Sequence, residues 1–470
     1  MSLPDKYQQA VIDDCARPAG DHFVVRARAG SGKTSTILNA IEHVPRGLSV
    51  LVCAFNSKIK NELVRKIDER GLCADVQTLH SYGFRQCGRM QIDHGKLRRH
   101  SEPVLIGAPG EYAQSVRKAV SLAKGKLCVE RQEVIDLISA HTLDVPPSDE
   151  ARFAEDVLTI MRACYTDKEC IDFDDQIWLP VMRKSRVWQY DRVFIDETQD
   201  LNLAQIRLAQ MACRPNGRII AVGDNRQAIY AFRGADSRAM ARIVDELKGY
   251  TLPLSVSYRS GKNIIREAQK WVPDIEWAPH AEDGFVGRCN ETEMVKNATR
   301  GDFVVSRKNA PLVKACLQFM RDGRPAFVLG QDVSADLSAL VIRSKARTVA
   351  KLLDWIDNWE EKQIKKATAK NPDADVQRIA DAAECIRVLS ENEETVDDVR
   401  AKLRTLFDDC DHDSKRITLM STHKAKGLEA DRVWMLRDTY LQRQGDEEEN
   451  LAYVATTRAK SELWHVRGIS

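Results

Sequence analysis

The segment ARAGSGKT (27–34) restricts the possible folds more than any other part of this chain of 470 residues. It follows an apolar run, HFVVRA (22–27), and it opens a stretch (33–44) whose apolar residues recur at helical spacing. Gly30 and Gly32 let the backbone turn its N–H groups inward, beside the positive end of the helix. The sequence therefore predicts a phosphate-binding loop between a buried strand and a helix.

Two side chains of this loop have a predicted role in chemistry. Lys33 supplies a positive charge for the β- and γ-phosphates of a nucleotide, and the hydroxyl of Thr34 can ligate Mg²⁺. The strict pattern GxxxxGK[ST] begins with glycine, whereas this chain has Ala27. A chance GxGKT in a surface loop is the alternative interpretation, and the flanking strand and helix argue against it.

Strands alternate with helices in two regions, a pattern typical of doubly wound α/β folds. The predicted strands lie at 22–27, 48–55, 192–197 and 218–224, and then at 302–308, 325–330, 417–422 and 431–437. A mainly helical insertion interrupts each region. We predict a first lobe formed by 1–84 and 172–258 around an insertion at 85–171, and a second formed by 259–330 and 411–470 around an insertion at 331–410.

The overall charge indicates no class of partner, because 71 Lys and Arg residues nearly balance 69 Asp and Glu residues. Residues 85–131 carry ten basic against four acidic side chains, which suits a solvated helical surface as well as one that follows phosphates. Between residues 355 and 410, 14 acidic side chains outnumber nine basic ones. That second segment is a poor candidate for gripping a nucleic-acid backbone.

Cysteine spacing and hydropathy favour a reducing compartment and no membrane segment. Twelve cysteines are scattered without a CxxC pair, as is typical of free thiols. No apolar run reaches the ~18 residues of a spanning helix. The polar N-terminus, MSLPDKYQQAVIDD, differs from a signal peptide. We expect a cytoplasmic protein, or a nuclear one if its host has a nucleus.

The segment VFIDETQD (193–200) places two adjacent carboxylates at the end of an apolar strand. Metal-assisted hydrolysis of a phosphate needs such a pair. Asp196 would hold Mg²⁺, usually through water, and Glu197 would accept a proton from the attacking water. Exposed acids at a strand end are the alternative, which the preceding phosphate loop makes less attractive.

The segment AVGDNRQAIYAFRGAD (221–236) joins a polar group to two aromatic rings within a few residues. Gln227 is positioned to contact a γ-phosphate, and Tyr230 and Phe232 would offer flat faces on which bases of a single strand stack. The alternative is that both rings belong to the core, against which the flanking Arg233 argues. We interpret the segment as a link between the state of a bound nucleotide and a platform for bases.

These motifs together resemble superfamily 1 DNA helicases of the Rep/UvrD type, in order and over nearly the whole chain. The matching segments are ARAGSGKT, LVCAFNSKIKNEL, VQTLHSYGF, IDFDDQIWL, VFIDETQDLN, AVGDNRQAIYAFRGAD, LPLSVSYRS, LMSTHKAKGLEADRV and LAYVATTRAK. The resemblance implies two RecA-like lobes with ATP between them, and a phosphate loop that tolerates alanine at position 27.

The resemblance also implies roles for residues that no pattern above assigns. Arg259 and Arg458 would meet the γ-phosphate as arginine fingers do, Tyr258 would stack on adenine, and Glu429 would contact the ribose. Gln8, favoured over Gln9, would read the adenine edge. The remaining loop residues that the resemblance assigns to ATP are Arg28, Ala29, Ser31 and Ser35, and those that it assigns to DNA are Phe55, Asn56, Thr78, His80, Arg233, Thr422 and His423.

From this resemblance we expect an ATP-dependent translocase on single-stranded DNA and a DNA helicase, moving 3′→5′, with ATP and Mg²⁺ as cofactors. Its expected partners are single-stranded DNA, junctions with duplex DNA, and replication or repair proteins; we expect a monomer or weak self-association and a nucleoid location. The second insertion is shorter than in large members, so a translocase that strips proteins from DNA with little unwinding is the alternative. A DNA-binding scaffold without activity and a 5′→3′ or RNA-directed relative are further alternatives, and the intact motifs oppose them.

Overall fold

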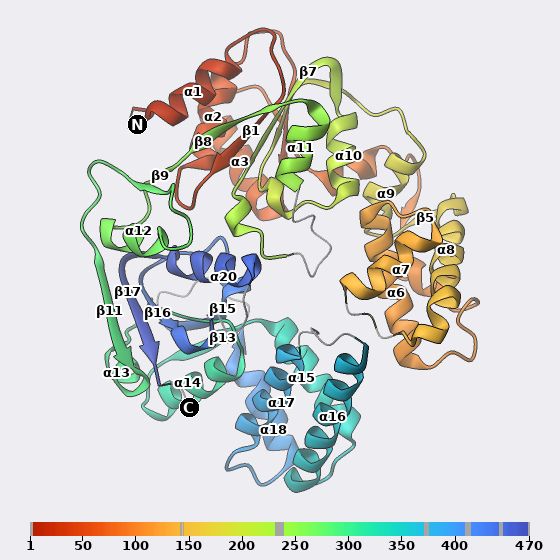
Figure 1. Cartoon of the computed structure of the whole chain (residues 1–470), viewed down its shortest axis with the longest axis vertical. Helices are drawn as coiled ribbons and strands as arrows, with labels where there is room; N and C mark the ends of the chain where they lie inside the picture. The colour runs from red at the N-terminus through yellow and green to blue at the C-terminus, as the bar shows by residue number, and fades with distance from the viewer. Residues whose placement is uncertain are drawn as a thin grey trace. The chain divides into compact units, whose positions relative to one another are not determined.

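The computed structural model describes residues 3–141, 143, 145–230, 239–370, 376–408, 415–440 and 445–468. Its contacts divide the chain into two compact units, Met1–Ser255 and Val256–Ser470 (Figure 1). Each unit is built on a sheet whose strands pair in parallel, and helices form most of the connections between them. The predicted α/β fold class is confirmed. The predicted boundaries of the lobes and their insertions stay a prediction.

The sheet of the first unit has the strand order β3-β2-β6-β7-β1-β8. Its strands are β1 (Phe23–Ala27), β2 (Val50–Ala54), β3 (Asp75–Thr78), β6 (Tyr190–Ile195), β7 (Cys213–Gly223) and β8 (Tyr250–Leu254). Its helices are α1 (Lys6–Cys15), α2 (Lys33–Glu42), α3 (Ser57–Glu69), α4 (Leu79–Arg85), α9 (Asp175–Met182), α10 (Leu203–Met211) and α11 (Ala239–Leu247).

Successive residues of these strands face two separate cores, as expected for a sheet covered on both faces. On β1, Val24 packs in a cluster with apolar residues of α10 and α11. Its neighbours Phe23 and Val25 pack in another cluster with residues of α1, α2 and α3. Because both faces are buried, the strands are continuous apolar runs, which is why the sequence revealed β1, β2, β6 and β7.

The insertion of the first unit has a hydrophobic core of its own. It consists of β4 (Gln91–Ile92), α5 (Lys96–Ser101), α6 (Gly110–Lys126), α7 (Arg131–Ala140), α8 (Glu150–Thr166) and β5 (Cys170–Ile171). Figure 1 shows α6, α7 and α8 gathered beside one another, and α8 packs on both α6 and α7. Most of the excess positive charge at 85–131 is neutralised here, because carboxylates contact Arg85, Lys96, Arg98, Arg99, Lys124 and Arg131.

Two of these basic residues are lysines with fully buried side chains. The Nζ atom of Lys96 lies 2.7 Å from Oδ2 of Asp175, and Nζ of Lys124 lies 2.8 Å from Oδ1 of Asp175 and 2.8 Å from Oδ2 of Asp172. The carboxylates raise the pKa of Lys124 against the opposing effect of burial. This buried tetrad of charges attaches α5 and α6 to the segment that begins α9.

The sheet of the second unit has the order β11-β17-β16-β12-β15-β13-β14. Its strands are β11 (Phe285–Asn290), β12 (Phe303–Ser306), β13 (Ala326–Leu329), β14 (Phe407–Asp408), β15 (Ile417–Ser421), β16 (Ala430–Leu436) and β17 (Ala459–Arg467), with a separate pair β9 (Val256–Ser257) and β10 (Glu276–Trp277). Its helices are α12 (Lys262–Ala268), α13 (Glu291–Asn297), α14 (Ala310–Arg321), α15 (Gln331–Ser344), α16 (Val349–Lys370), α17 (Gln377–Ser390), α18 (Val396–Leu406), α19 (Thr422–Ala425) and α20 (Asp446–Thr456).

The helices α15 to α18 form most of the predicted second insertion and share a core with the sheet.

Within the residues that the structure describes, every helix is too short or too polar to cross a membrane.

Candidate functional site

Three neighbouring strands of the first unit carry the predicted nucleotide residues at one edge. In the order β6-β7-β1, the carboxyl end of β6 precedes Asp196 and Glu197, that of β7 precedes Gln227, and that of β1 precedes the phosphate loop. Because all three strands are parallel, these ends meet at the same edge of the sheet. Segments far apart in the sequence therefore supply one site.

The loop has the conformation that its glycines predict. Gly30 and Gly32 take positive φ angles of 72° and 76°, and α2 begins at Lys33. The Nε2 atom of Gln8 donates to the carbonyl oxygen of Ser31 at 3.3 Å, so α1 braces the loop. A side chain at position 32 would crowd this amide at 3.1 Å. Gln9, in contrast, is exposed and bonds to Asp13.

The other predicted loop residues differ in exposure. Ala27, Arg28, Ala29 and Ser31 are buried. Thr34 is half-buried in the first turn of α2, whereas Ser35 is exposed.

The candidate phosphate ligand and the candidate general base form an ion pair. The Nζ atom of Lys33 lies 2.7 Å from Oε1 of Glu197. Burial lowers the pKa of Lys33, but the carboxylates of Glu197 and Asp196 outweigh it and raise that pKa overall. Glu197 has a positive φ of 50°, a conformation that non-glycine residues rarely adopt and that is often found at functional sites.

Asp196 is a buried carboxylate beside this pair. Burial, and then the charge of Glu197, raises the pKa of Asp196 despite the opposing charge of Lys33. The backbone N–H of Glu197 donates to Oδ1 of Asp196 at 2.9 Å. Asp196 is therefore a carboxylate whose ionised form a bound cation would stabilise.

Gln199 connects the strand ends, and the sequence interpretation did not identify it. Its Nε2 atom donates to Oε2 of Glu197 at 2.6 Å, and its Oε1 atom accepts from the N–H of Asp224 at 3.0 Å. Gln227 donates to Oδ2 of Asp224 at 2.8 Å, and Arg28 pairs with Oδ1 at 3.1 Å. The sequence signal that could have identified Gln199 is the group of polar residues that directly follows each of the apolar strands β6 and β7.

The donors present suit Mg²⁺ and a nucleotide. A hydroxyl and a carboxylate are ligands that Mg²⁺ prefers, and it commonly takes only one or two protein ligands besides water and substrate phosphates. Among the described residues no cluster of three or more His, Cys, Asp or Glu side chains could hold a metal by itself. Thr34 and Asp196 would hold the ion, and it would supply charge neutralisation at the phosphates.

The predicted DNA residues of the first unit follow the next two strands, β2 and β3, at the same edge. Phe55 is 37% exposed, directly after β2. Asn56 and Thr78 cap α3 and α4, accepting from the N–H groups of Ile59 and Ser81 at 2.9 and 3.1 Å. Their side chains therefore already accept hydrogen bonds as the N-caps of these helices.

His80 stacks on an aromatic ring that the sequence interpretation did not single out. The ring centroids of His80 and Phe173 lie 3.8 Å apart with nearly parallel planes. Burial lowers the pKa of His80 to about 4, so the ring is neutral near pH 7 and offers no charge to a phosphate. Phe173 is 56% exposed and lies between the anchored Asp172 and Asp175, so its free face is held in place.

Tyr230 is half-buried after Gln227, and the predicted platform residues Phe232 and Arg233 lie outside the described residues.

In the second unit Arg259 and Glu429 form an ion pair, with 2.6 Å between Nε and Oε2. Lys460 lies 3.0 Å from the other oxygen of Glu429. Burial would raise the pKa of Glu429, but these two cations hold it below its ordinary value. Tyr258, next to Arg259, is 46% exposed.

Arg458 is almost completely buried within the second unit. Its guanidinium donates to the carbonyl oxygens of Val454 at 2.9 Å and Leu428 at 3.0 Å. In this structure the guanidinium is therefore bonded to the backbone of its own unit.

Thr422 is buried too, and its hydroxyl lies 2.6 Å from that of Tyr440. His423 is half-buried. Both follow the carboxyl end of β15, whereas Glu429 and Arg458 precede the amino ends of β16 and β17. The predicted DNA and nucleotide residues of this unit thus lie at opposite edges of its parallel sheet.

Comparison with known proteins connects both units to one family. Residues 8–248 match the UvrD/REP helicase N-terminal domain, and residues 328–466 match the UvrD-like helicase C-terminal domain. The ATP-dependent DNA helicase Rep of Escherichia coli is 27% identical over 291 residues, covering 56% of this chain and 42% of that protein. The Rep protein of Salmonella typhimurium is 28% identical over 275 residues, covering 52% and 40%.

The ATP-dependent DNA helicase PcrA of Bacillus subtilis is 27% identical over 291 residues, covering 55% of this chain and 38% of that protein. The chain therefore spans about two-fifths of the length of the curated relatives that it matches. The first family domain contains the phosphate loop with its facing carboxylates, and both domains match in order. On this evidence the chain belongs to the UvrD/Rep family of superfamily 1 helicases, and its two parallel-sheet units are consistent with RecA-like lobes.

Proposed function

We propose that the protein is an ATP-dependent translocase on single-stranded DNA and a DNA helicase that moves 3′→5′. The observation that carries this proposal is one sheet edge with two kinds of residue. Lys33, Asp196 and Glu197 follow β1 and β6, and the aromatic side chains Phe55 and His80 follow β2 and β3. A nucleotide site and a base-stacking surface on one rigid sheet are what coupling of hydrolysis to movement requires.

In this mechanism the loop N–H groups and Lys33 bind the phosphates of ATP, and Glu197 accepts a proton from the attacking water. Gln199 holds the carboxylate of Glu197, and Asp224 and Gln227 extend the same hydrogen-bonded chain. Tyr230 follows Gln227 three positions later in the sequence. As the family resemblance implies, Arg259 and Arg458 would stabilise charge on the transferred phosphate, with Tyr258, Glu429 and Gln8 holding the nucleoside. Thr422 and His423 would contact DNA.

The test is ATP hydrolysis with and without single-stranded DNA, beside unwinding of duplexes that carry a 3′ or a 5′ single-stranded tail. We expect stimulated hydrolysis and preferential unwinding of the 3′-tailed duplex. Absence of stimulation would contradict the motor function, and preference for the 5′ tail would contradict the polarity alone.

A second candidate is a translocase that strips proteins from DNA but unwinds little. The acidic composition between residues 355 and 410 favours it, because helices with excess carboxylates are poor at holding a duplex. Displacement of streptavidin from biotinylated single-stranded DNA, without unwinding of tailed duplexes, would select this candidate. In either case we place the protein in the cytoplasm at the nucleoid, with replication or repair proteins as the partner class.

A further inference from the structure

Arg28 is a buried arginine within the phosphate loop. Its side chain is 6% exposed, and its Nη1 atom lies 3.1 Å from Oδ1 of Asp224 and 3.1 Å from Oδ1 of Asn225. The backbone N–H of Arg28 donates to the carbonyl oxygen of Leu254 at 2.8 Å, at the end of β8. The side chain of this residue therefore ties the phosphate loop to the segment that follows β7, whereas its backbone ties the loop to β8.

Asp224 is a completely buried carboxylate whose two oxygens both accept hydrogen bonds. Its Oδ1 atom accepts from Arg28 and from the backbone N–H of Arg226 at 3.1 Å, and Oδ2 accepts from Nε2 of Gln227 at 2.8 Å. Burial of a charged carboxylate is costly unless a cation and hydrogen bonds compensate it. Since Arg28 supplies a positive charge at this carboxylate, the phosphate loop helps to compensate the buried charge of Asp224.

The charge of Asp224 decides which way the amide group of Gln227 faces. An ionised carboxylate can only accept hydrogen bonds, so the amide nitrogen of Gln227 must be the atom that faces it. A protonated carboxyl group can also donate, and it would bond to either end of the amide. Gln227 is 6% exposed and is predicted to contact a γ-phosphate, so the direction of its amide matters for the reaction.

We propose that Arg28 is a positioning residue for ATP hydrolysis. Its charge holds Asp224 as an acceptor, and Asp224 in turn holds the amide of Gln227 in one direction beside the γ-phosphate. Arg28 thus acts on the reaction through Gln227, although it belongs to the loop that binds the phosphates. This inference rests on the proposed function, in which the protein hydrolyses ATP at this sheet edge.

The experiment is a double-mutant cycle on ATP hydrolysis by the full-length chain, with Arg28→Gln, Gln227→Ala and the variant that carries both changes. Misplacement of a reacting group by about 1 Å can cost about 100-fold in rate, so Arg28→Gln is expected to lower kcat about 10- to 100-fold. The KM for ATP should stay nearly unchanged. Because Arg28 acts through Gln227, the variant with both changes should be as slow as Gln227→Ala alone. Losses that multiply in that variant would overturn the proposal.

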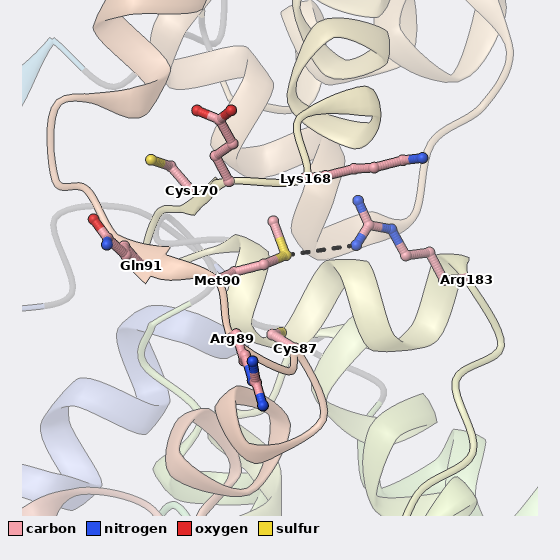
Figure 2. A pocket seen from close by; sticks show the side chains of 8 residues that line it. Cys87, Arg89, Met90, Gln91, Lys168, Cys170 and Arg183 are labelled. Carbon is pink, nitrogen blue, oxygen red and sulfur yellow. Dashed lines mark hydrogen bonds between the residues drawn. The ribbon is translucent and has the colours of Figure 1, made fainter.

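Arg183→Gln is the matched control for loss of a bonded arginine in the same unit. Arg183 lines a pocket of about 540 Å³ in the insertion, where Figure 2 shows its guanidinium bonded to Sδ of Met90, and it also donates to the carbonyl oxygen of Tyr165 at 2.6 Å. It precedes β6, whereas the site follows the carboxyl end of that strand. Arg183→Gln should therefore leave kcat without DNA unchanged, and a loss equal to that of Arg28→Gln would overturn the proposal.

Two further measurements separate positioning from general damage to the loop. Arg28→Lys retains the positive charge and should retain most of kcat, so equal losses in Arg28→Lys and Arg28→Gln would contradict a role for the charge. ADP lacks the γ-phosphate, so its Kd should be the same for Arg28→Gln and the wild type. An affinity for ADP that falls together with kcat would show a disrupted nucleotide site and would likewise reject the positioning role.

Wild-type hydrolysis with and without an oligothymidylate of about 16 nucleotides, measured in the same assay, tests the proposed function separately. Hydrolysis that DNA does not stimulate would reject the motor function, and the cycle on the basal rate would still decide the role of Arg28. A stimulated wild type whose Arg28→Gln variant keeps the wild-type kcat would reject only the positioning role.

Discussion

The ammonium nitrogen of Lys33 lies 2.7 Å from a carboxylate oxygen of Glu197, so the candidate phosphate ligand and the candidate general base neutralise each other. Phosphates that bind at the loop must compete with Glu197 for Lys33. Release of Glu197 from this pair would leave it available to accept a proton.

Glu197→Gln is therefore expected to bind ATP more tightly while hydrolysis falls about 10²- to 10⁴-fold, the usual contribution of a general base. Lys33→Ala should abolish hydrolysis through loss of nucleotide binding. Both variants should still bind single-stranded DNA. Nucleotide titrations and steady-state hydrolysis separate the two effects, and weaker ATP binding by Glu197→Gln would contradict the competition.

Gly223 ends β7 where a side chain would collide with Gln199. A Cβ atom at position 223 would lie 2.4 Å from Oε1 of Gln199. Gly223→Ala should therefore displace that amide and lower kcat with little change in the KM for ATP, as Gln199→Ala should do directly. Gly110→Ala is the control, because a Cβ atom at position 110 would meet open space. Gly47 also has open space around it, but its positive φ would strain an alanine there. Equal kcat values for Gly223→Ala and Gly110→Ala would count against a positioning role of Gln199.

The raised pKa of Asp196 predicts a pH-dependent stability. A carboxyl group with a higher pKa in the folded than in the unfolded protein binds protons more tightly when folded. The contribution of Asp196 to the free energy of unfolding should thus fall as pH rises from the ordinary aspartate value of ~3.9 through the raised value. Asp196→Asn removes this loss, so its Tm should exceed that of the wild type increasingly across this window. A Tm difference that does not vary with pH would show that Asp196 does not titrate as inferred.

The buried tetrad predicts a large penalty for removing one charge. Lys124→Met leaves Asp172 and Asp175 with an uncompensated negative charge, which should cost about 3–5 kcal/mol of unfolding free energy. Lys126→Met, on the same helix but without a carboxylate contact within the described residues, should change it by less than about 1 kcal/mol. Chemical denaturation measures both, and equal stability of the two variants would refute the assignment.

Phe173 predicts a stacking contribution to DNA binding. Loss of one stacked base is worth about 1–3 kcal/mol, so Phe173→Ala should weaken binding to oligothymidylate by at least about fivefold. Trp188→Ala is the control, because Trp188 is 69% exposed but precedes β6, at the opposite edge of the sheet. Similar losses in both variants would indicate nonspecific contact with exposed rings.

Most strands of the two main sheets could be predicted from the sequence because they are buried on both faces. Three of the strands that were missed have clear physical causes. β11 is the outermost strand of the second sheet and none of its residues is buried, so it lacks an apolar run. β17 carries Lys460 and Glu462, and β8 contains Pro253, which hid both from a search for continuous hydrophobic segments.

The candidate site likewise contains residues that could be predicted from the sequence and residues that could not. Lys33, Asp196 and Glu197 were predictable because these residues follow the ends of recognisable apolar strands. Gln199 was not, since its role depends on contacts across two strands that the spacing does not reveal. The charge of Lys96 likewise gave no sign of burial, because its partner Asp175 lies far along the chain.

The register of β1 has a consequence for the order in which the chain can assemble during synthesis. Phe23 lies opposite Ile220 on β7 and Tyr250 on β8. The strand that precedes the nascent phosphate loop therefore gains neither of these neighbours until β7 (Cys213–Gly223) has been synthesised, while the self-contained helices α6 to α8 can pack earlier. Nucleotide binding should thus be a late event in biogenesis, and chaperones that shield apolar strands would act in the interval before it.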